Sequence, residues 1–382
     1  MDLEPSKLQK QLQKAAREFL QKECPMTVIR EVEEDDKGYS AELWRKMGDL
    51  GWLSTSMIFP KEYGGEEGSL LELAMLYEEM GRVLLPSPHL SSVVLSGLVL
   101  LNAGNEKQKA DLLPKLEGGE QIFTLALTEP EYSWDAASIS TRAVAEGDSF
   151  IINGTKMFIP YAHVADYILC AARTKDSGAP EENISLFIID ARHSTGLNCR
   201  RINGFLGEPL CQVTLNNVKV SSSNLLGKAN NGWSYIDRAI RVGTVMQCCE
   251  MIGGAHAVLE LTINYAKQRT QFGQFIGSFQ RVQDRIINML SDLDKTRLVT
   301  YEAAWRLSEG LPCDLEVSIA KALASEAYHN ICEESHYVHA GIGFMKDYDL
   351  YLHTKKARTV KNNFGGPAFH RNIIAKEIAL RA

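Results

Sequence analysis

The sequence predicts an α+β protein with an N-terminal helical domain, a middle antiparallel β-barrel or sandwich domain and a C-terminal helical bundle. In residues 5–118, and again from Gly232 onward, apolar residues recur at three- and four-residue steps, which is the period of an α-helix. Between these regions, short apolar runs alternate with turn residues such as Asn153-Gly154, a pattern typical of an all-β module. We therefore predict three domains, at residues 1–119, 120–228 and 229–382.

Glycine and proline separate the N-terminal helices. The first helix is amphipathic, with Leu8, Leu12, Ala15 and Phe19 on one face and Lys7, Lys10 and Lys14 on the other. A break at residues 59–65 precedes a long apolar helix from Ser69 to about Arg82. Pro86 and Pro88 then exclude helix. Two further helices follow, the first carrying Val93, Leu95, Leu98 and Leu101 and the second running from Asn105 to Gly118-Gly119.

The middle domain is predicted from five short runs with strand character. They are bounded by turn residues such as Glu146-Gly147-Asp148, so each run reads as a single strand of an antiparallel module. The runs are Phe123–Thr128, Phe150–Asn153, Tyr167–Cys170, Leu186–Ile189 and Cys211–Leu215.

The stretch Arg269–Gly273, with Gln280 close behind it, interrupts two long helical patterns in the C-terminal domain. A guanidinium can fork onto phosphate oxygens and an aromatic ring offers a stacking face, so Arg269 and Phe272 suit an anionic, planar ligand. An ordinary turn with a structural arginine explains the same residues, and spacing by itself does not separate the two interpretations.

Composition excludes several classes of protein. A net charge of -7 argues against a general nucleic-acid binder. No run of about 18 apolar residues predicts a membrane span, and Met1–Pro5 does not open a secretory signal. The eight cysteines lack metal-ligand spacing, so we expect no metal site and read them as scattered reduced thiols of a cytoplasmic protein.

Three sets of motifs extend over the chain. The N-terminal set is Pro60–Gly65 with Tyr77–Arg82, the middle set is Leu127–Pro130 with Asn153–Ile159, and the C-terminal set is Arg269–Gly273 and Gln280 with His339–Phe344. With these motifs in this order, the chain closely resembles the acyl-CoA dehydrogenase family over essentially its whole length. The resemblance implies an FAD-dependent oxidoreductase that acts on the CH–CH group of an acyl-CoA thioester.

The resemblance also implies a cofactor site between the β domain and the C-terminal helices, completed by a neighbouring subunit. In the middle domain the matching residues are Leu125, Leu127 and Thr128 along the flavin, and Phe158 and Ile159 on its ring. In the C-terminal domain they are Arg269, Phe272 and Gln280 toward the diphosphate and adenosine, and Gly341 where the second dimer approaches. Glycine admits a phosphate near the backbone and arginine neutralises it, so we expect FAD and a tetramer.

The usual catalytic base of the family is missing from both of its known positions. In the family, a glutamate removes the α-proton of the thioester while hydride leaves the β-carbon. Aligned without gaps, Phe364 stands at the glutamate position near the C-terminus, and Gly243 stands at the alternative position on the first C-terminal helix. Neither residue can accept a proton.

Further departures lie near the expected flavin. Trp134, in Glu131–Asp135, replaces the serine of the family's Gly-x-Gly-Ser-Asp loop, and Pro160 replaces a threonine that hydrogen-bonds the flavin. In the acyl-pocket stretch we assign Ser87 and Ser91, with Trp134, to substrate binding. His89 is a weak candidate for the base, against the alternative of a histidine that only lines the pocket. Glu250, Asp347 and Asp349 are poor substitutes.

Three functions stay open at this point. The first is an FAD-dependent acyl-CoA dehydrogenase whose base is relocated or missing. The second is a non-catalytic or half-site subunit that pairs with a homologous, glutamate-bearing chain, and the third is a CoA-ester binding protein without redox chemistry. The implied partners are an acyl-CoA thioester, a homo-tetramer or heteromer, and an electron-transfer flavoprotein. No nucleic acid and no membrane span are expected.

Overall fold

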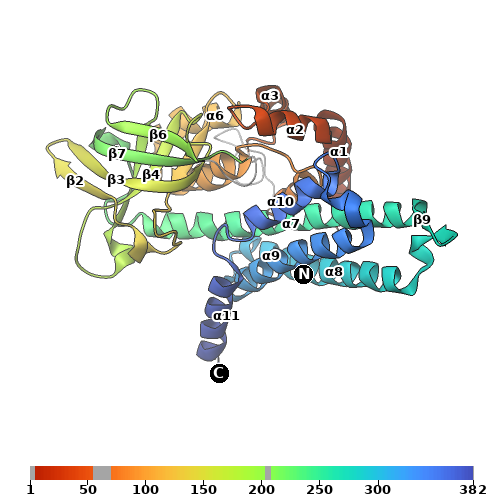
Figure 1. Cartoon of the computed structure of the whole chain (residues 1–382). Coiled ribbons are helices and arrows are strands. Elements are labelled where there is room, and N and C mark those ends of the chain that lie inside the picture. The colour runs from red at the N-terminus through yellow and green to blue at the C-terminus, as the bar shows by residue number, and fades with distance from the viewer. Residues whose placement is uncertain (1–4, 55–69, 203–207, 382) are drawn as a thin grey trace. The chain divides into compact units, whose positions relative to one another are not determined.

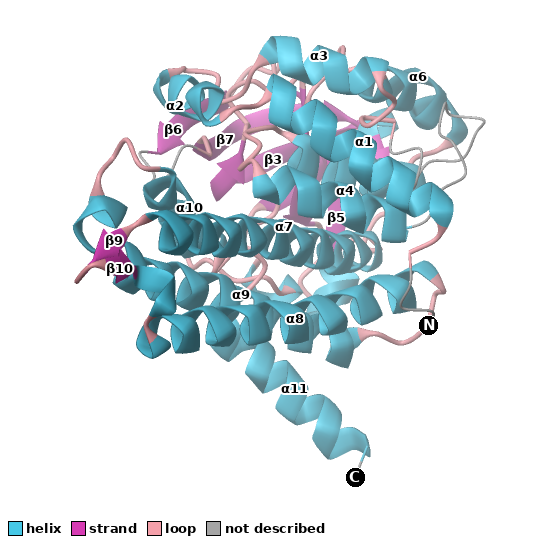
Figure 2. Cartoon of the chain, turned by 90° about the vertical axis from the view of Figure 1, so that its right-hand side faces the viewer, coloured by secondary structure: helices cyan, strands magenta, loops and turns pink. Residues whose placement is uncertain are grey.

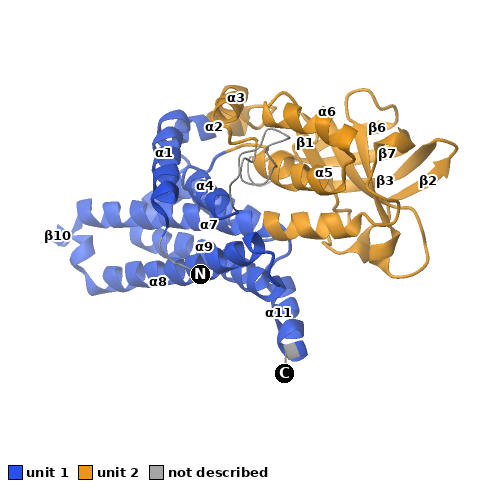
Figure 3. Ribbon diagram, turned by 180° about the vertical axis from the view of Figure 1, so that it is seen from behind, with its two compact units in different colours: residues 1–30, 69–85, 244–382 blue, residues 31–68, 86–243 orange. Residues whose placement is uncertain are grey.

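The structure is a computed structural model that describes residues 5–54, 70–202 and 208–381 (Figure 1). It confirms the predicted α+β class, with helical N- and C-terminal parts around a central sheet. The chain divides into two units: unit 1 holds residues 1–30, 69–85 and 244–382, and unit 2 holds residues 31–68 and 86–243 (Figure 3). The three-domain boundaries stay a prediction. The predicted break at residues 59–65 and the helix start at Ser69 lie outside the described residues.

Unit 1 is helical. Its elements are α1 (Lys7–Glu23), α4 (Leu70–Arg82), the second part of α7 (Trp233–Gln268), α8 (Gln280–Ser308), α9 (Asp314–His339), α10 (Asp349–Val360) and α11 (Pro367–Arg381). A capping box between Ser6 and Gln9 starts α1, because each side chain accepts a hydrogen bond from the other residue's amide. Figure 2 shows α8 and α9 side by side. A short hairpin, β9 (Thr270–Gln271) with β10 (Gln274–Phe275), joins α7 to α8.

Two glycines let α4 and α7 approach each other closely. A Cβ atom on Gly81 would lie 1.9 Å from the Glu250 carbonyl oxygen, and one on Gly253 would lie 1.8 Å from the Glu78 carbonyl oxygen. Each glycine therefore faces the backbone of the other helix. Any larger residue would force the helices apart.

Unit 2 is built on a sheet with the strand order β6-β7-β3-β2-β4-β5-β8, and β1 pairs with β4. The strands are β1 (Phe123–Ala126), β2 (Arg142–Glu146), β3 (Ser149–Pro160), β4 (Tyr167–Arg173), β5 (Ile184–Asp190), β6 (Leu197–Ile202), β7 (Leu210–Ser221) and β8 (Leu225–Leu226). Helices α3 (Ala41–Asp49), α5 (Gly97–Ala103) and α6 (Glu106–Glu117) belong to this unit, as does a π-helical segment (Leu90–Ser96), and α2 (Met26–Glu34) crosses its boundary.

The five predicted strand runs are all present, and three strands come in addition. Strand β2 buries only Ala143, and β6 alternates half-buried with exposed residues and carries two arginines, so neither gives a continuous apolar signal. Most pairs are antiparallel, as predicted. The pairs β1–β4 and β2–β4 are parallel, which local sequence patterns do not reveal because they depend on how distant segments meet.

Candidate functional site

The chain that leaves β1 runs beside the end of β3. The Met157 amide donates to the Thr128 carbonyl at 2.9 Å, and the Thr128 hydroxyl donates back to the Met157 carbonyl at 2.6 Å. Near Pro160, the Thr124 hydroxyl donates to that residue's carbonyl at 2.7 Å. These bonds bring the flavin residues predicted on the first segment, Leu125, Leu127 and Thr128, next to those on the second, Phe158 and Ile159.

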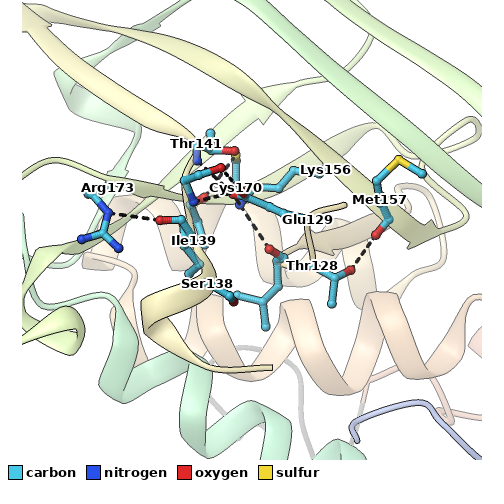
Figure 4. A network of polar contacts seen from close by, with 12 residues as sticks. Thr128, Glu129, Ser138, Ile139, Thr141, Lys156, Met157, Cys170 and Arg173 are labelled. Carbon is cyan, nitrogen blue, oxygen red and sulfur yellow. Dashed lines mark hydrogen bonds and ion pairs between the residues drawn. The ribbon is translucent and has the colours of Figure 1, made fainter. Parts of the chain in front are cut away.

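A buried ion pair fixes this junction (Figure 4). Lys156 Nζ lies 2.8 Å from Glu129 Oε1, with 0% and 4% of the two side chains exposed. The same ammonium donates to the Leu127 carbonyl at 3.2 Å, and the amides of Ser140 and Thr141 each donate to the Glu129 carboxylate at 2.9 Å. Every oxygen of the carboxylate therefore has a donor, as burial of a charge requires.

The ion pair also decides the charge of Glu129. Burial raises the pKa of its carboxyl, but the Lys156 ammonium and the hydrogen-bond donors outweigh burial and lower it to about 2. Glu129 and Lys156 belong to the motifs Leu127–Pro130 and Asn153–Ile159, but the sequence does not predict that they pair. The one sequence signal is Lys156 itself, a single charged residue within an apolar strand run.

An aromatic cluster lies beside Phe158. The Tyr132 ring meets the Phe158 ring edge-on at 5.2 Å between centroids, and the Trp134 ring meets Tyr132 at 6.2 Å. Burial raises the pKa of the Tyr132 hydroxyl, and a hydrogen bond from Trp134 offsets part of that rise. Trp134, predicted to bind substrate, thus contacts Phe158, predicted to bind flavin, through the ring of Tyr132, which is not among the predicted site residues.

The predicted acyl-pocket residues lie where the chain enters the π-helical segment Leu90–Ser96. The Ser91 hydroxyl donates to the Pro88 carbonyl at 3.0 Å, and the Ser87 hydroxyl accepts from the His89 amide at 3.3 Å. Both serines are therefore engaged with the local backbone. A π-helical turn is rare and recurs at functional sites, and the assignment of this segment to the acyl pocket stays a prediction.

His89 has the surroundings of a structural histidine. Its Nε2 lies 3.0 Å from the Trp52 carbonyl, to which it donates, and the ring is buried. Burial lowers the pKa of His89 to about 4, although the Trp52 carbonyl works in the opposite direction. A general base at neutral pH works best with a pKa near 7, and a pKa of about 4 lies well below that value.

The second group of predicted flavin residues lies in unit 1. Arg269 lies between the end of α7 and the start of β9. Phe272 occupies the tip of the β9–β10 hairpin, and 92% of its surface is exposed. Phe272 and Gly273 both have positive φ, +54° and +79°, which is the signature of a tight two-residue hairpin turn. Gln280 is exposed at the first residue of α8.

Gly341 lies at the same end of the helices as this hairpin, although about seventy residues separate it from Arg269. The Tyr265 ring, one turn before Arg269, stacks on the His339 ring with centroids 4.4 Å apart. The Thr262 and Ser335 hydroxyls, 2.7 Å apart, add a second link. A Cβ atom on Gly341 would have no described atom within 4 Å, so this backbone faces open space.

Phe364 lies in the turn between α10 and α11. It is buried, has φ +57°, and its carbonyl accepts a hydrogen bond from His370 Nε2 at 3.0 Å. The buried Lys321 ammonium donates to the carbonyls of Val360 and Lys361 at 3.4 and 2.9 Å, at the end of α10. The turn that holds Phe364, the residue predicted to stand at the base position, is thus held by hydrogen bonds to backbone carbonyls.

The other acidic residues have partners of their own. Glu250 accepts from Lys356 at 2.8 Å and from the Gln247 amide at 3.0 Å. Asp349 pairs with Arg30 at 3.0 Å, and Arg30 also donates to the Asp347 carbonyl. Gly243 is buried within α7. The carboxylates of Glu250 and Asp349 are therefore already engaged with cations.

Neither a metal centre nor a membrane helix is found in the described part of the chain. No group of three or more His, Cys, Asp and Glu side chains among the described residues is arranged to hold a metal ion. Within the same residues, no helix combines the length and the apolar character needed to cross a membrane. All eight cysteines are free thiols.

Comparison with known proteins extends over the whole chain. Residues 6–120 match the model of the acyl-CoA dehydrogenase N-terminal domain, residues 124–218 the middle domain and residues 230–379 the C-terminal domain. A curated relative, the caffeyl-CoA reductase-Etf complex subunit CarC of Acetobacterium woodii, is 34% identical over 350 residues, which cover 90% of this chain and 91% of the relative.

Two solved structures share the fold. The acyl-CoA dehydrogenase from Geobacillus kaustophilus superimposes with a TM-score of 0.91 at 27% identity, covering 99% of this chain and all of that one. A chain of the ChsE4-ChsE5 complex from Mycobacterium tuberculosis gives a TM-score of 0.89 at 26% identity, with 99% of both chains covered. The chain belongs to the acyl-CoA dehydrogenase family, whose members are oxidoreductases of acyl-CoA thioesters.

Proposed function

We propose that this protein binds FAD and exchanges hydrogen at the Cα–Cβ bond of an acyl-CoA thioester, with its catalytic base relocated or missing. The observation that carries this proposal is the junction held by Thr128, Met157 and the Lys156–Glu129 pair, because it keeps the flavin-matching segments together while Phe364 stands at the base position. The named relative from Acetobacterium woodii is a reductase, so the exchange can run toward the saturated thioester.

The residues present fit the cofactor. Arg269 is exposed and has no acidic partner among the described residues, so its guanidinium is available to a diphosphate. The open space at Gly341 leaves room for a phosphate or a partner chain near the backbone. When bound, FAD supplies an acceptor for the hydride of the β-carbon. Leu125, Leu127, Thr128, Phe158 and Ile159 would hold its ring, and Arg269, Phe272, Gln280 and Gly341 its other half.

Removal of the proton at the α-carbon is the step for which the family's two base positions supply no base. Phe364 and Gly243 have no titratable side chain, and the His89 ring donates a hydrogen bond to a backbone carbonyl. Ser87, Ser91 and Trp134 would shape and line the acyl site. Proton transfer must therefore come from another group, from solvent, or from a partner subunit.

A half-site subunit is the second candidate. The missing glutamate favours it, and so does the likeness to a chain from a complex of two named proteins, ChsE4 and ChsE5. In that arrangement this chain would contribute Arg269, Phe272 and Gly341 to an assembly whose other chain carries the base.

The assembly and its surroundings are part of the same proposal. We propose a homo-tetramer or a heteromer, with an electron-transfer flavoprotein as the redox partner, since the named relative belongs to an Etf complex. The eight free thiols support a cytoplasmic location. We further propose that residues 1–119, 120–228 and 229–382 are separate domains.

The visible spectrum of the purified protein tests the proposal. A flavin band that bleaches when acyl-CoA esters are added without oxygen supports the enzyme. A flavin band that no ester bleaches supports the half-site subunit, and bleaching restored by a glutamate-bearing homologous chain would settle that case. A protein that takes up no FAD yet binds acyl-CoA overturns both and leaves the CoA-ester binding function.

A further inference from the structure

Two cysteines of the sheet in unit 2 share one face. Cys199 on β6 pairs with Val213 on β7, and Cys211 on β7 pairs with Arg201 on β6, so the two cysteines are diagonal neighbours across the strands. Since side chains two residues apart on a strand point the same way, Cys211 and Val213 lie on the face that holds Cys199. The two thiols interact as hydrogen-bond partners, and this interaction raises the pKa of Cys199 and lowers that of Cys211.

A histidine completes the cluster. Cys211 Sγ lies 3.5 Å from His163 Nδ1, and His163 Nε2 lies 3.0 Å from the Asp36 carbonyl oxygen. Because a carbonyl only accepts, Nε2 carries a proton and Nδ1 faces the sulfur. The ring can therefore take the proton of Cys211 and, as imidazolium, donate at both nitrogens. This is the arrangement that activates a thiol.

The environment stabilises negative charge on Cys211. The hydrogen bond with Cys199 lowers the pKa of the Cys211 thiol, burial opposes it, and the contact with His163 lowers it further, to about 5. The same hydrogen bond and burial raise the pKa of Cys199. Arg201 and Arg192 also lie in the surroundings, and they pair with Asp36 at 3.2 Å and Asp166 at 2.6 Å.

The cluster opens on a cavity. A pocket of about 360 Å³ is lined by Cys199 and His163 together with Ala162, Val164, Ala165, Ala191, Arg192 and Leu197. Cys211 is fully buried behind it, whereas Cys199 is half-buried and lines the pocket. The Cys199 sulfur is thus accessible from the pocket, and the Cys211 sulfur beside it is the one on which negative charge is stabilised.

Five of the other six thiols differ from this pair in both burial and pKa. Cys24, Cys170, Cys248, Cys249 and Cys332 are buried, and burial raises the pKa of each of them. A thiol that is buried and held neutral is unreactive, because the thiolate is the nucleophile. These thiols therefore serve as internal controls for the Cys199–Cys211 pair.

We propose that Cys199 and Cys211 form an oxidation site, in which a hydroperoxide entering the pocket converts the dithiol to a disulfide. As the Cys199 sulfur attacks the peroxide oxygen, the neighbouring Cys211 thiolate takes the Cys199 proton in the same step. The O–O bond breaks, the alcohol leaves with that proton, and Cys199 becomes a sulfenic acid.

The second step closes the disulfide. The Cys211 thiolate attacks the Cys199 sulfur, the S–O bond breaks, and the departing hydroxide takes the proton of the His163 imidazolium to form water. Overall the two sulfurs lose two electrons, and the hydroperoxide is reduced to one alcohol and one water. Atoms, protons and charge balance, and no further reactant is needed.

The resulting disulfide would be easy to reduce. Diagonal neighbours in an antiparallel pair have Cα atoms about 7–8 Å apart, whereas disulfides span about 4.4–6.8 Å. The bond therefore requires β6 to shift toward β7. In the described sheet β6 is an edge strand that pairs with β7 alone, so a shift of β6 disturbs no second strand. Strained disulfides have the more oxidising potentials, and they are the reversible ones.

The test uses tert-butyl hydroperoxide on the purified full chain, with free thiols counted and disulfides mapped by mass spectrometry. We expect two thiols to be lost per chain, a single Cys199–Cys211 bond, and complete reversal by dithiothreitol. Cys211→Ser lacks both the thiolate that takes the Cys199 proton and the sulfur that closes the bond, so it should form no disulfide and should reach a Cys199 sulfenic acid, trapped by dimedone, only slowly. Cys199→Ser should lose fast oxidation altogether. Cys170→Ala, on β4 of the same sheet, should behave like the unchanged protein.

The pH profile separates an activated pair from two ordinary thiols. Between pH 6 and pH 8 the oxidation rate should change less than threefold, whereas an ordinary thiol gains on the order of a hundredfold. His163→Gln should restore the steep profile, with circular dichroism confirming its fold. The proposal is overturned if the disulfide maps to other cysteines, or if Cys199→Ser oxidises as fast as the unchanged chain.

Discussion

Lys156 Nζ lies 2.8 Å from Glu129 Oε1, and this contact joins the strand that ends at Pro160 to the segment that leaves β1. Residues 27 positions apart are joined by this ion pair, which is shielded from water, and the hydrogen bonds between Thr128 and Met157 link the same two segments. The flavin-matching residues on both segments depend on these contacts for their positions. The consequences of removing either partner are therefore both structural and functional.

Removing only the cation should be strongly destabilising. Lys156→Met leaves the Glu129 carboxylate buried without its counter-charge, and breaking a buried pair in this way typically costs about 3–5 kcal/mol. The double variant Lys156→Met/Glu129→Leu removes both charges and should recover most of that loss. Denaturant unfolding of the three proteins measures this. Equal stability of the single variant and the unchanged chain would show that the pair does not hold the junction.

Arg269→Ala should weaken FAD binding without unfolding the protein. A charge-assisted bond to a phosphate contributes about 1.5–3 kcal/mol, so the dissociation constant should rise about tenfold to a hundredfold. Fluorescence titration of the apoprotein with FAD measures the change. Arg281→Ala, an equally exposed arginine at the start of α8, is the matched control and should leave binding unchanged. Identical constants for the two variants would remove Arg269 from the site.

Phe364→Glu should raise the turnover of straight-chain acyl-CoA esters. A positioned base contributes about a hundred- to ten-thousand-fold, and burial raises the pKa of a carboxyl toward the range that a base needs. Phe364 already has φ +57°, so glutamate adds no new backbone strain. Phe364→Gln has the same size but no basic oxygen, and it should stay as slow as the unchanged chain. A gain shared by both variants would point to pocket volume instead.

If the unchanged chain proves fast, another group is the base, and His89→Ala identifies whether it is His89. If Phe364→Glu stays slow while the flavin spectrum is normal, the Trp134 and Pro160 positions have altered how substrate or flavin is seated. The half-site function then becomes the better proposal.

Acid should destabilise the fold between about pH 6.5 and pH 4. Burial lowers the pKa of His89 to about 4, of His353 to about 3 and of His370 to about 4. The unfolded chain binds protons at these residues below its ordinary pKa of about 6.5, while the folded chain does not, so stability is full above that pH and falls as pH falls.

The loss at pH 5 should be on the order of 2 kcal/mol for each of these residues. His370→Gln should therefore narrow the difference in unfolding free energy between pH 7 and pH 5 by about that amount. His193→Gln, at a side chain that is 81% exposed, should not. Denaturant melts at both pH values measure the effect, and an unchanged difference in His370→Gln would contradict it.

Assembly should depend on the tip of the β9–β10 hairpin. Phe272 is 92% exposed, which is unfavourable for a large aromatic ring unless another surface covers it. Phe272→Asp should lower the molar mass measured by light scattering at micromolar concentration. Leu8→Asp, at a residue on α1 that is 71% exposed, is the control and should leave the mass unchanged. A monomeric, flavin-bound unchanged chain would refute the oligomer.

The sequence by itself determined the fold class, the strand runs with a buried face, and the residue types at the family's positions. Periodicity reports which face of a helix or strand is buried, and the motifs in register predict that Phe364 and Gly243 stand at the family's two base positions. The strands β2 and β6 were not predicted, because few of their side chains are buried and no apolar pattern marks them.

Only the tertiary structure decided which distant residues meet. Glu129 with Lys156, Tyr265 with His339, and Cys199 with Cys211 and His163 are pairs set by strand register and helix packing. A single sequence holds no record of those contacts, because each residue looks locally like a solvated charge, a core ring or a stray thiol. Burial and the partner then shift the pKa of each group: that of the Glu129 carboxyl falls to about 2, and that of the Cys211 thiol falls to about 5.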